Sequence, residues 1–409
     1  MAATTDILAG IIPLTDSALL VAARECGFAE EEGIGLALIR ETSWANIRDR
    51  IAIGHFQAAH MLGPMPIAAA LGLTPLRQAV IAPMALGLGG NAVTVSAALF
   101  EQMRATGLID VLAPATGGAA LRAVVEKRRA EGMPPLQFGV VHPHSGHNFE
   151  LRYWLASSGI RPDRDIDIVI APPPFMPDAL ASGQVDGFCV GEPWNSVAVA
   201  SGAGRIATVK SAIWRSGPEK VLGVHAGWAE RNGDALARLI RALYRAAEWC
   251  GNPKNHAALA HILARPDYLG VPASLTVKAI DGSILGPFAP RSDIIFFAPF
   301  AGAATFPWQS HALWFYSQMV RWGQVAHTPA HAEAARRCYR PDLYRAALKP
   351  LAAALPGASA KVEGALKAPS PVGATPGTLV LGPDGFFDDA IFDPDKLDDY
   401  IAAQRPTLG

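Results

Sequence analysis

The sequence predicts an α/β fold made of two similar lobes that present strand ends to a shared ligand cleft. Two observations support this prediction. Short apolar runs alternate with helix-period segments through the first 225 residues, which is typical of parallel βαβ units. In addition, segment 52–65 is echoed 129 residues later by segment 181–194, an offset about the size of one lobe. A chain of 409 residues, half of them hydrophobic, is long enough for more than one such unit.

Strands are expected where short apolar runs are bounded by turn signals. They fall at 7–12, 36–39, 58–62, 93–96, 138–141, 166–170, 187–190 and 221–224. Helices are expected between them, where apolar residues recur with the period of a helix. They fall at 17–26, 45–53, 121–129, 150–158 and 175–181.

The second half of the chain has a different hydrophobic pattern. After residue 230 the pattern turns mostly helical, and one amphipathic helix is clear from its apolar face. That face consists of Leu236, Leu239, Ile240, Leu243 and Ala247. The Ala-, Pro-, Gly- and Ser-rich stretch 350–377 is expected to loop over the surface.

The echo aligns residues of the same structural type. The aligned pairs are Gly54 with Gly183, Phe56 with Val185, and Pro64 with Pro193. Each copy predicts a helix, a glycine C-cap, a short buried strand and a proline that opens the next turn. We therefore expect lobe 1 to comprise residues 1–91 and 206–409, with a helical C-terminal extension, and lobe 2 to comprise 92–205. The ligand is expected outside the carboxyl ends of the strands.

Composition excludes several classes of protein. Lys and Arg number 35 against 36 acidic residues, a net charge of -1, so the basic surface of a nucleic-acid or membrane-surface protein is absent. Three long stretches lack charged residues, 51–76, 78–100 and 294–320, but each holds prolines, histidines or glycines that a membrane-spanning helix avoids. Four scattered cysteines fit a reducing compartment. With no basic leader before the first strand, a cytoplasmic protein is expected.

Three histidines, His142, His144 and His147, follow the strand expected at 138–141, and a helix begins just after them. A metal site is disfavoured, because no nearby carboxylate or cysteine completes a ligand set. The free N–H groups of the helix start, capped by Ser145 and Asn148, favour an anion instead. The alternative is an ordinary capped helix with surface histidines.

The glycine-rich segment 87–91 is a weaker signal. Ala92 stands where a dinucleotide fingerprint needs its third glycine, and no P-loop lysine is present, so a nucleotide site is disfavoured. A crossing between lobes, where the backbone approaches a small ligand, explains the glycines equally well. Cys189 lies within a strand-like run and is expected to be an inert buried thiol rather than a nucleophile.

Three further side chains are candidates for the cleft. Trp44 lies at a helix start with Ser43 as N-cap, where it either anchors packing or lines the cleft with its indole N–H as a donor. Glu192 follows the strand 187–190, and Lys220 begins the next strand. A lone lysine is commonly a solvated charge, but at a strand mouth within a cleft it is the natural partner of a small anion.

Taken together, these motifs resemble one family along almost the whole chain, from about residue 6 to FFDDAIFDPDKLDDYI. The matching segments are IPLTDSALLVAARECGFAEEEGI, ETSWANIRDRIAIG, HMLGPMPIAAALG, VHPHSGHNFELRYWLASSGI, VDGFCVGEPWNSVA and PEKVLGV. They are similar to the nitrate/bicarbonate (NrtA/CmpA) branch of ABC-transporter substrate-binding proteins. The resemblance implies a type II, two-lobed periplasmic-binding-protein-like fold, whose Rossmann-like lobes are joined by crossing strands and close over the ligand.

The resemblance also implies a nitrate site. Trp44 and His142 would line it, and Lys220 would neutralise the anion. The glutamine that uptake proteins place on a crossing strand falls near Gly89 or Gly90 here, so backbone N–H groups would substitute for its side chain.

Asn91, His147 and Glu192 are expected around that site. Glu192 would orient Lys220 or His142 and stay off the anion, because two like charges repel in a closed cleft. Since Lys220 is expected in the cleft and not in a core, its replacement should leave the fold intact.

Among the branches of the family, the resemblance is greatest to cytoplasmic nitrate/nitrite sensors of the NasS type, because the chain begins at the first strand. It implies a non-enzymatic sensor that sequesters a NasT-like RNA-binding antiterminator and releases it when ligand binds, controlling nitrate assimilation genes. No cofactor, metal, direct nucleic-acid contact or membrane contact is implied. The alternatives are an exported component of a nitrate/bicarbonate ABC transporter, or an enzyme on a related scaffold, as in thiamin pyrimidine synthases.

Overall fold

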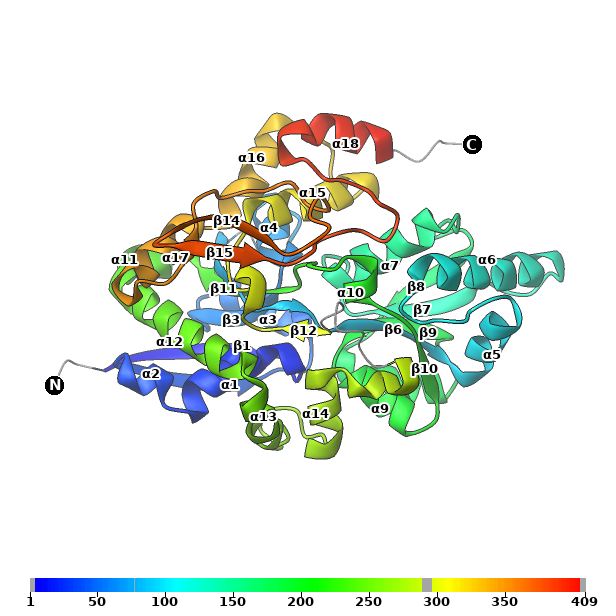
Figure 1. Ribbon diagram of the computed structural model, residues 1–409, viewed down its shortest axis with the longest axis horizontal. Coiled ribbons are helices and arrows are strands. Elements are labelled where there is room, and N and C mark those ends of the chain that lie inside the picture. Colours follow the sequence, from blue (N-terminus) through cyan, green and yellow to red (C-terminus); the bar gives the residue numbers. More distant parts are fainter. Residues whose placement is uncertain (1–3, 77, 289–295, 405–409) are drawn as a thin grey trace.

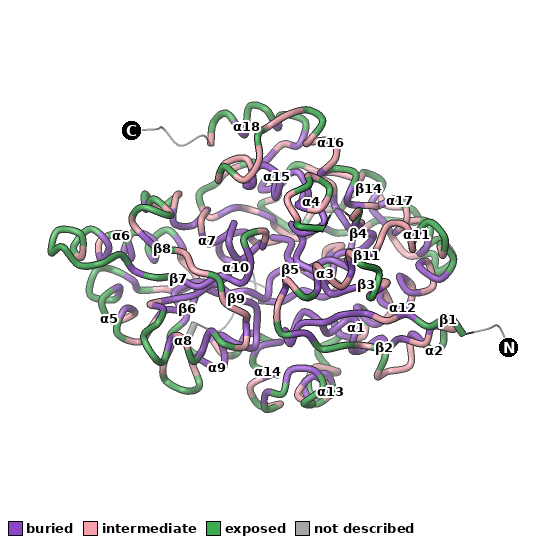
Figure 2. Tube along the Cα trace, turned by 180° about the vertical axis from the view of Figure 1, so that it is seen from behind, coloured by how far each residue is buried: buried purple, intermediate pink, exposed green. Residues whose placement is uncertain are grey.

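The computed structural model describes residues 4–76, 78–288 and 296–404. Two five-stranded sheets with flanking helices form two lobes that lie side by side, and a largely helical C-terminal portion covers the first lobe (Figure 1). The central strands of both sheets are buried, whereas exposed residues gather on the outer helices and loops (Figure 2). The α/β class predicted from the alternating pattern is confirmed.

The first sheet has the strand order β2-β1-β3-β11-β4. Its strands are β1 (Thr5–Ile11), β2 (Ile34–Arg40), β3 (Ala58–Leu62), β4 (Val80–Ala85) and β11 (Lys220–His225). β1 pairs in parallel with β2 and β3, whereas β11 runs antiparallel between β3 and β4. The helices of this part are α1 (Ala18–Glu25), α2 (Phe28–Glu31), α3 (Trp44–Ala52), α4 (Pro64–Ala70), α11 (Ala226–Arg231) and α12 (Gly233–Gly251).

The second sheet, read from its far edge, has the order β8-β7-β9-β6-β10. Its strands are β6 (Asn91–Ser96), β7 (Leu136–Val140), β8 (Ile166–Ile170), β9 (Gly187–Gly191) and β10 (Gly204–Val209). The pairing repeats that of the first sheet, with β7 parallel to β8 and β9, and β6 antiparallel to β9 and β10. Its helices are α5 (Ala97–Ala105), α6 (Pro114–Ala130), α7 (Gly146–Ser157), α8 (Met176–Ala181), α9 (Trp194–Ala200) and α10 (Lys210–Ile213).

The echo seen in the sequence is a structural repeat. Strand β3 lies at 58–62 and strand β9 at 187–191, the offset that the alignment predicted. Gly54 and Gly183 end the preceding helices with φ values of 75° and 73°. Only a residue without a Cβ adopts this left-handed conformation without strain, which explains why both copies carry glycine there.

The remaining chain forms the C-terminal portion. Its helices are α13 (His256–Leu263), α14 (Ala273–Asp281), α15 (Gln309–Arg321), α16 (Pro329–Cys338), α17 (Pro341–Leu348) and α18 (Leu397–Gln404). Strand β12 (Phe297–Ala298) pairs with β5 (Leu88–Gly89) at the crossing between the lobes. The prediction of a surface loop over 350–377 is wrong in part, because β13 (Leu355–Pro356) and β14 (Ser370–Thr375) lie in it and form a small sheet with β15 (Thr378–Leu381).

Several local predictions can be compared directly with the structure. The apolar face predicted after residue 230 is the buried face of α12, and each of its five residues is at most 2% exposed. The predicted lobe boundary at 205/206 falls inside β10, which pairs with β6 and so belongs to the second sheet. Strand β4 escaped prediction because Pro83 lies within it, and proline normally argues against a strand. Within the described ranges, no helix combines the length and apolarity that a bilayer crossing requires.

Candidate functional site

The candidate site lies where the two sheets present the same kind of edge. In each lobe the parallel strands end there and the antiparallel strand begins there. In lobe 1, Trp44 follows β2 and Lys220 starts β11. In lobe 2, His142 follows β7, and Asn91 starts β6. The topology therefore brings together residues that are far apart in the sequence, as expected for the ligand side of an α/β fold.

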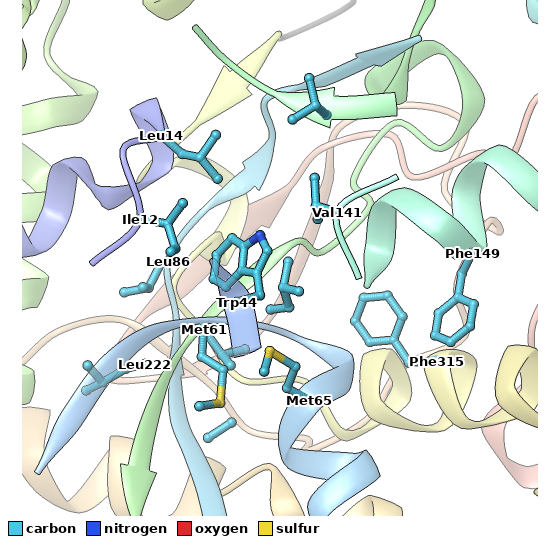
Figure 3. Packing of buried hydrophobic residues seen from close by; sticks show 14 of the residues in the cluster. Ile12, Leu14, Trp44, Met61, Met65, Leu86, Val141, Phe149, Leu222 and Phe315 are labelled. Atoms are coloured by element: carbon cyan, nitrogen blue, oxygen red, sulfur yellow. The ribbon is translucent and has the colours of Figure 1, made fainter. Parts of the chain in front are cut away.

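Trp44 is held at this edge by the start of α3. Ser43 caps the helix, its side chain accepting a hydrogen bond from the Asn46 backbone N–H at 3.3 Å. The indole is 1% exposed and packs among apolar side chains from both lobes, including Leu14 and Val141 (Figure 3). Its Nε1 has no hydrogen-bond partner within the described part of the chain. Trp44 therefore both anchors the packing and offers a free donor.

Lys220 is fully buried and already paired with two carboxylates. Its Nζ lies 2.8 Å from Asp16 Oδ2 and 2.9 Å from Glu219 Oε1, and 5.6 Å from the centre of the Trp44 ring. Burial opposes protonation of the amine, but the two carboxylates outweigh it and raise the pKa of Lys220. Lys220 is therefore part of the buried interior, and the expectation that it lies outside a core is wrong.

His60, on β3, completes the group around Lys220. Its Nε2 lies 2.9 Å from Asp16 Oδ1, and its ring centre lies 5.3 Å from that of Trp44. Burial lowers the pKa of His60, although the neighbouring Asp16 carboxylate acts in the opposite direction. Burial also opposes ionisation of Asp16, but Lys220 and His60 lower its pKa to about 2.

A second ionic group faces the first from the lobe 2 side. Lys210, at the start of α10, contacts Glu150 of α7 and lies 3.0 Å from Glu219 Oε2. Asn91 donates to Glu219 at 2.8 Å and to Glu150 at 3.4 Å. Burial raises the pKa of Glu150 to about 7 despite the adjacent lysine. Glu219 thus joins the two lysines, and its pKa is lowered well below the ordinary value.

The carboxylate of Glu219 fits only because residue 146 is glycine. A Cβ at Gly146 would lie 2.2 Å from Glu219 Oε2, far inside contact distance. Since that oxygen is fixed by Lys210 and Asn91, it has little room to move aside. The glycine between Ser145 and His147 is thus required by packing.

The three histidines do not form a metal centre. His142 Nδ1 accepts the backbone N–H of His144 at 3.1 Å, whereas His147 Nδ1 lies 3.4 Å from Glu219 Oε1. Within residues 4–76, 78–288 and 296–404, no three metal-ligating side chains converge on one point. Burial lowers the pKa of His142 and of His147 to about 3, so both imidazoles are neutral at physiological pH. Both are also buried, so the alternative of surface histidines does not describe them.

Gly89 and Gly90 cannot act as predicted. The Gly89 N–H donates to Gly217 O at 3.2 Å, and the Gly90 N–H donates to Phe296 O at 2.7 Å. Both N–H groups already donate hydrogen bonds that hold the crossing segments together, so they are not available to an anion. The glycines have positive φ values, 79° and 84°, and a backbone role at the crossing explains them.

Glu192 also differs from its predicted role. Its Oε2 accepts the backbone N–H of Ser196 at 3.1 Å, and no contact with Lys220 or His142 is formed within the described residues. Burial raises the pKa of Glu192 to about 7, so it carries little charge at slightly acidic pH. Glu192 thus caps α9 and does not orient the cation.

Several buried polar atoms near this edge have no hydrogen-bond partner within the described chain. Besides the Trp44 indole, they include Thr15 Oγ1, Asn91 Oδ1, His147 Nε2 and Ser196 Oγ. Buried polar atoms normally find partners, so a group of unsatisfied ones indicates a ligand or solvent position. Gly191 lies beside one of them, since a Cβ there would be 3.3 Å from Asn91 Oδ1 and 3.7 Å from Asp16 Oδ2. These atoms are the polar groups at this edge that a ligand or solvent would satisfy.

Sequence reasoning missed five of these residues. They are Asp16, His60, Lys210, Glu150 and Glu219. Asp16 and Glu219 had a usable signal, since Asp16 follows the first strand and Glu219 directly precedes Lys220. Cys189, in contrast, is buried as expected, and burial raises the pKa of its thiol well above the ordinary value.

Comparison with known proteins gives a consistent picture. Residues 2–264 match the model of the NMT1-like family. The chain is 30% identical to the nitrate/nitrite binding protein NrtA of Nostoc sp., over 97% of this chain and 85% of that protein. It is equally similar, at 30% identity, to NrtA of Synechococcus elongatus, over 96% of this chain and 84% of that protein.

It is also 34% identical to the nitrate import ATP-binding protein NrtC of Synechocystis sp., over 84% of this chain but only about half the length of that protein. Among solved structures, the periplasmic nitrate-binding protein NrtA from Synechocystis superposes with a TM-score of 0.84 at 24% identity, covering 98% of each chain. A sulfonate-type relative, the alkanesulfonate-binding protein SsuA from Xanthomonas axonopodis, gives a TM-score of 0.54 at 16% identity, covering 78% of this chain and 95% of that chain. The two-lobed periplasmic-binding-protein-like fold predicted from the sequence is confirmed.

Proposed function

This chain belongs to the NMT1-like family, and on that premise we propose that it is a receptor that binds nitrate or nitrite between its two lobes. The proposal is supported by the relatives named as nitrate/nitrite binding proteins, with which the chain aligns over nearly its whole length. It is a proposal of binding without chemical turnover.

One structural observation supports an anion above all. The buried ammonium of Lys220 lies beside the Trp44 indole, whose N–H has no partner within the described residues. A cation and a fixed neutral donor suit a small planar anion, whose charge is spread over several oxygens. The neutral imidazole of His142 can supply one further hydrogen bond without adding charge.

The first expected result concerns ligand identity. Nitrate at about a hundred times its dissociation constant should stabilise the fold by roughly 2.7 kcal/mol, because a ligand that binds only the native state stabilises it by mass action. Thermal melting and calorimetric titration with nitrate, nitrite, bicarbonate and chloride, run in parallel at one ionic strength, measure this. A melting temperature that rises equally with nitrate and chloride would rule out a specific nitrate site.

We further propose that the receptor acts as a sensor of the NasS type, with a NasT-like RNA-binding antiterminator as partner. The contacts between lobes support a ligand-dependent surface. Trp194 Nε1 of lobe 2 donates to Pro13 O of lobe 1 at 2.9 Å, and Thr15 N donates to Glu192 O at 2.7 Å. Opening the lobes breaks these bonds, so a partner that prefers one arrangement responds to the ligand. The net charge of -1 favours a protein partner that contacts the RNA over direct binding of RNA by this chain.

Co-purification tests the sensor. We expect the empty receptor to retain the antiterminator, and nitrate to release it. Linkage requires the reverse effect as well, so an excess of partner should weaken the apparent nitrate affinity by the same factor. A complex indifferent to nitrate, or one formed only with nitrate, would contradict the sensor, whereas a periplasmic location would favour the alternative of a transporter component. Chemical conversion of the bound anion would instead favour an enzyme.

A further inference from the structure

Asp16 lies in the short helix η1 (Thr15–Ser17), directly after the first strand, and is 4% exposed. Each of its carboxylate oxygens faces one basic side chain. Oδ2 is 2.8 Å from Lys220 Nζ, and Oδ1 is 2.9 Å from His60 Nε2. Asp16 is therefore an internal anion that pairs with Lys220, the lysine that we expect to neutralise the charge of the ligand.

The lysine belongs to a chain of buried ion pairs. Lys220 and Lys210 contribute two positive charges, and Asp16 and Glu219 contribute two negative charges. Burial raises the pKa of the further carboxyl, Glu150, to about 7. The ammonium of Lys220 is therefore already paired before a ligand enters, and an anion at this site experiences the field of Asp16 and Glu219 as well as that of the lysines.

We propose that Asp16 sets the charge selectivity of the site, admitting ligands with one negative charge and rejecting those with two. This inference rests on the proposed function, because it concerns the same site. The negative charge of Asp16 repels an anion bound at Lys220, and its carboxylate need not touch that anion. Coulomb energy is proportional to the product of the charges, so Asp16 opposes a dianion twice as strongly as a monoanion in free energy. Burial of the site away from water increases this difference between dianion and monoanion.

A purely structural role for Asp16 predicts something else. If Asp16 only held Lys220 in position, removing its charge would weaken all anions to a similar degree. The ratio of dianion to monoanion affinity separates the two roles, because a loss of positioning does not favour the more highly charged ligand.

The decisive variant is Asp16→Asn, which keeps the size of the side chain and one hydrogen-bond acceptor. If nitrate binding tightens by about tenfold, sulfate binding should tighten by about a hundredfold, since the electrostatic free energy doubles with the charge. Calorimetric titration of both proteins with nitrate and sulfate at constant ionic strength gives the ratio. Asp163→Asn is the matched control, because Asp163 is also a carboxylate paired with a basic side chain, Arg152, but is exposed.

Glu219→Gln serves as a second variant if Asp16→Asn fails to fold, since Glu219 also pairs with Lys220, at 2.9 Å. It should shift the sulfate-to-nitrate ratio in the same direction. A wild type that binds nitrate, with variants that leave the ratio unchanged, would overturn the role of Asp16 and leave the proposed function standing. A wild type that binds no nitrate, together with a variant that gains sulfate binding, would overturn the proposed function and leave the role of Asp16 standing. If neither protein binds any anion, both proposals fall.

Discussion

Replacing Lys220 by alanine is expected to lower the free energy of unfolding by about 3–5 kcal/mol, the usual cost of removing one partner of a buried ion pair. The reason is that two carboxylates, Asp16 and Glu219, lose the cation that lies within 3 Å of each. Urea unfolding followed by circular dichroism measures the change. Where the variant still folds, nitrate binding should weaken by about 2–5 kcal/mol in a parallel titration.

Three further variants test this expectation. Lys367→Ala is the matched control, because Lys367 forms an exposed pair with Asp389 and its loss should change little. The double variant Lys220→Met with Asp16→Asn removes one charge of each sign, so it should recover part of the stability that Lys220→Ala loses. Lys220→Glu places a third carboxylate in the group and should abolish both folding and binding. An alanine variant that unfolds and binds like the wild type would remove Lys220 from both roles.

The second large effect is a steep loss of stability in acid, between about pH 4.5 and pH 3. Burial holds the pKa of His142 and of His147 at about 3, below the usual 6.5. The unfolded chain therefore binds more protons than the folded one throughout that interval, and stability falls as the pH falls. At about 1.36 kcal/mol per pKa unit, two imidazoles over 1.5 pH units cost roughly 4 kcal/mol.

Carboxyl groups shape the rest of the profile. Glu150 and Glu192 have pKa values raised to about 7, so their contribution is lost as the pH rises from 4.5 to 7. It opposes the histidines above pH 4.5, so the dependence of stability on pH should be weaker there than below pH 4.5. Below that pH the pKa of Asp16, lowered to about 2, adds to the loss, because its carboxylate stabilises the fold only while ionised.

A single variant isolates the histidine contribution. His147→Gln removes one buried imidazole, and the loss of stability between pH 4.5 and pH 3 should shrink by about 2 kcal/mol, which is 1.5 pH units for one group. His261→Gln is the control, since His261 is exposed. Chemical unfolding at half-unit pH steps measures all three proteins. An unchanged acid profile in His147→Gln would show that the buried imidazole does not control it.

The architecture was accessible from the sequence because it rests on local signals. The apolar runs at 58–62 and 187–190, each between a C-cap glycine and a proline, predict the repeat that the strands β3 and β9 form. Periodicity and turn residues act over a few neighbours, so they can be recognised in one dimension. The same signals placed Trp44 at a helix start and Lys220 at a strand start.

The charge state of the site was decided only by the tertiary structure. Whether Lys220 is free or paired depends on Asp16, which lies 204 residues earlier, and on how the ends of β1 and β11 meet across the sheet. Likewise, the Gly90 N–H was predicted to face the anion, but it donates to the carbonyl oxygen of Phe296, which belongs to a crossing segment far along the chain. A sequence pattern shows which face of an element is buried but not which side chain meets it there. In a buried cluster of charged side chains, the charge of each residue depends on which side chains contact it, since each ion pair alters the energy of its neighbours.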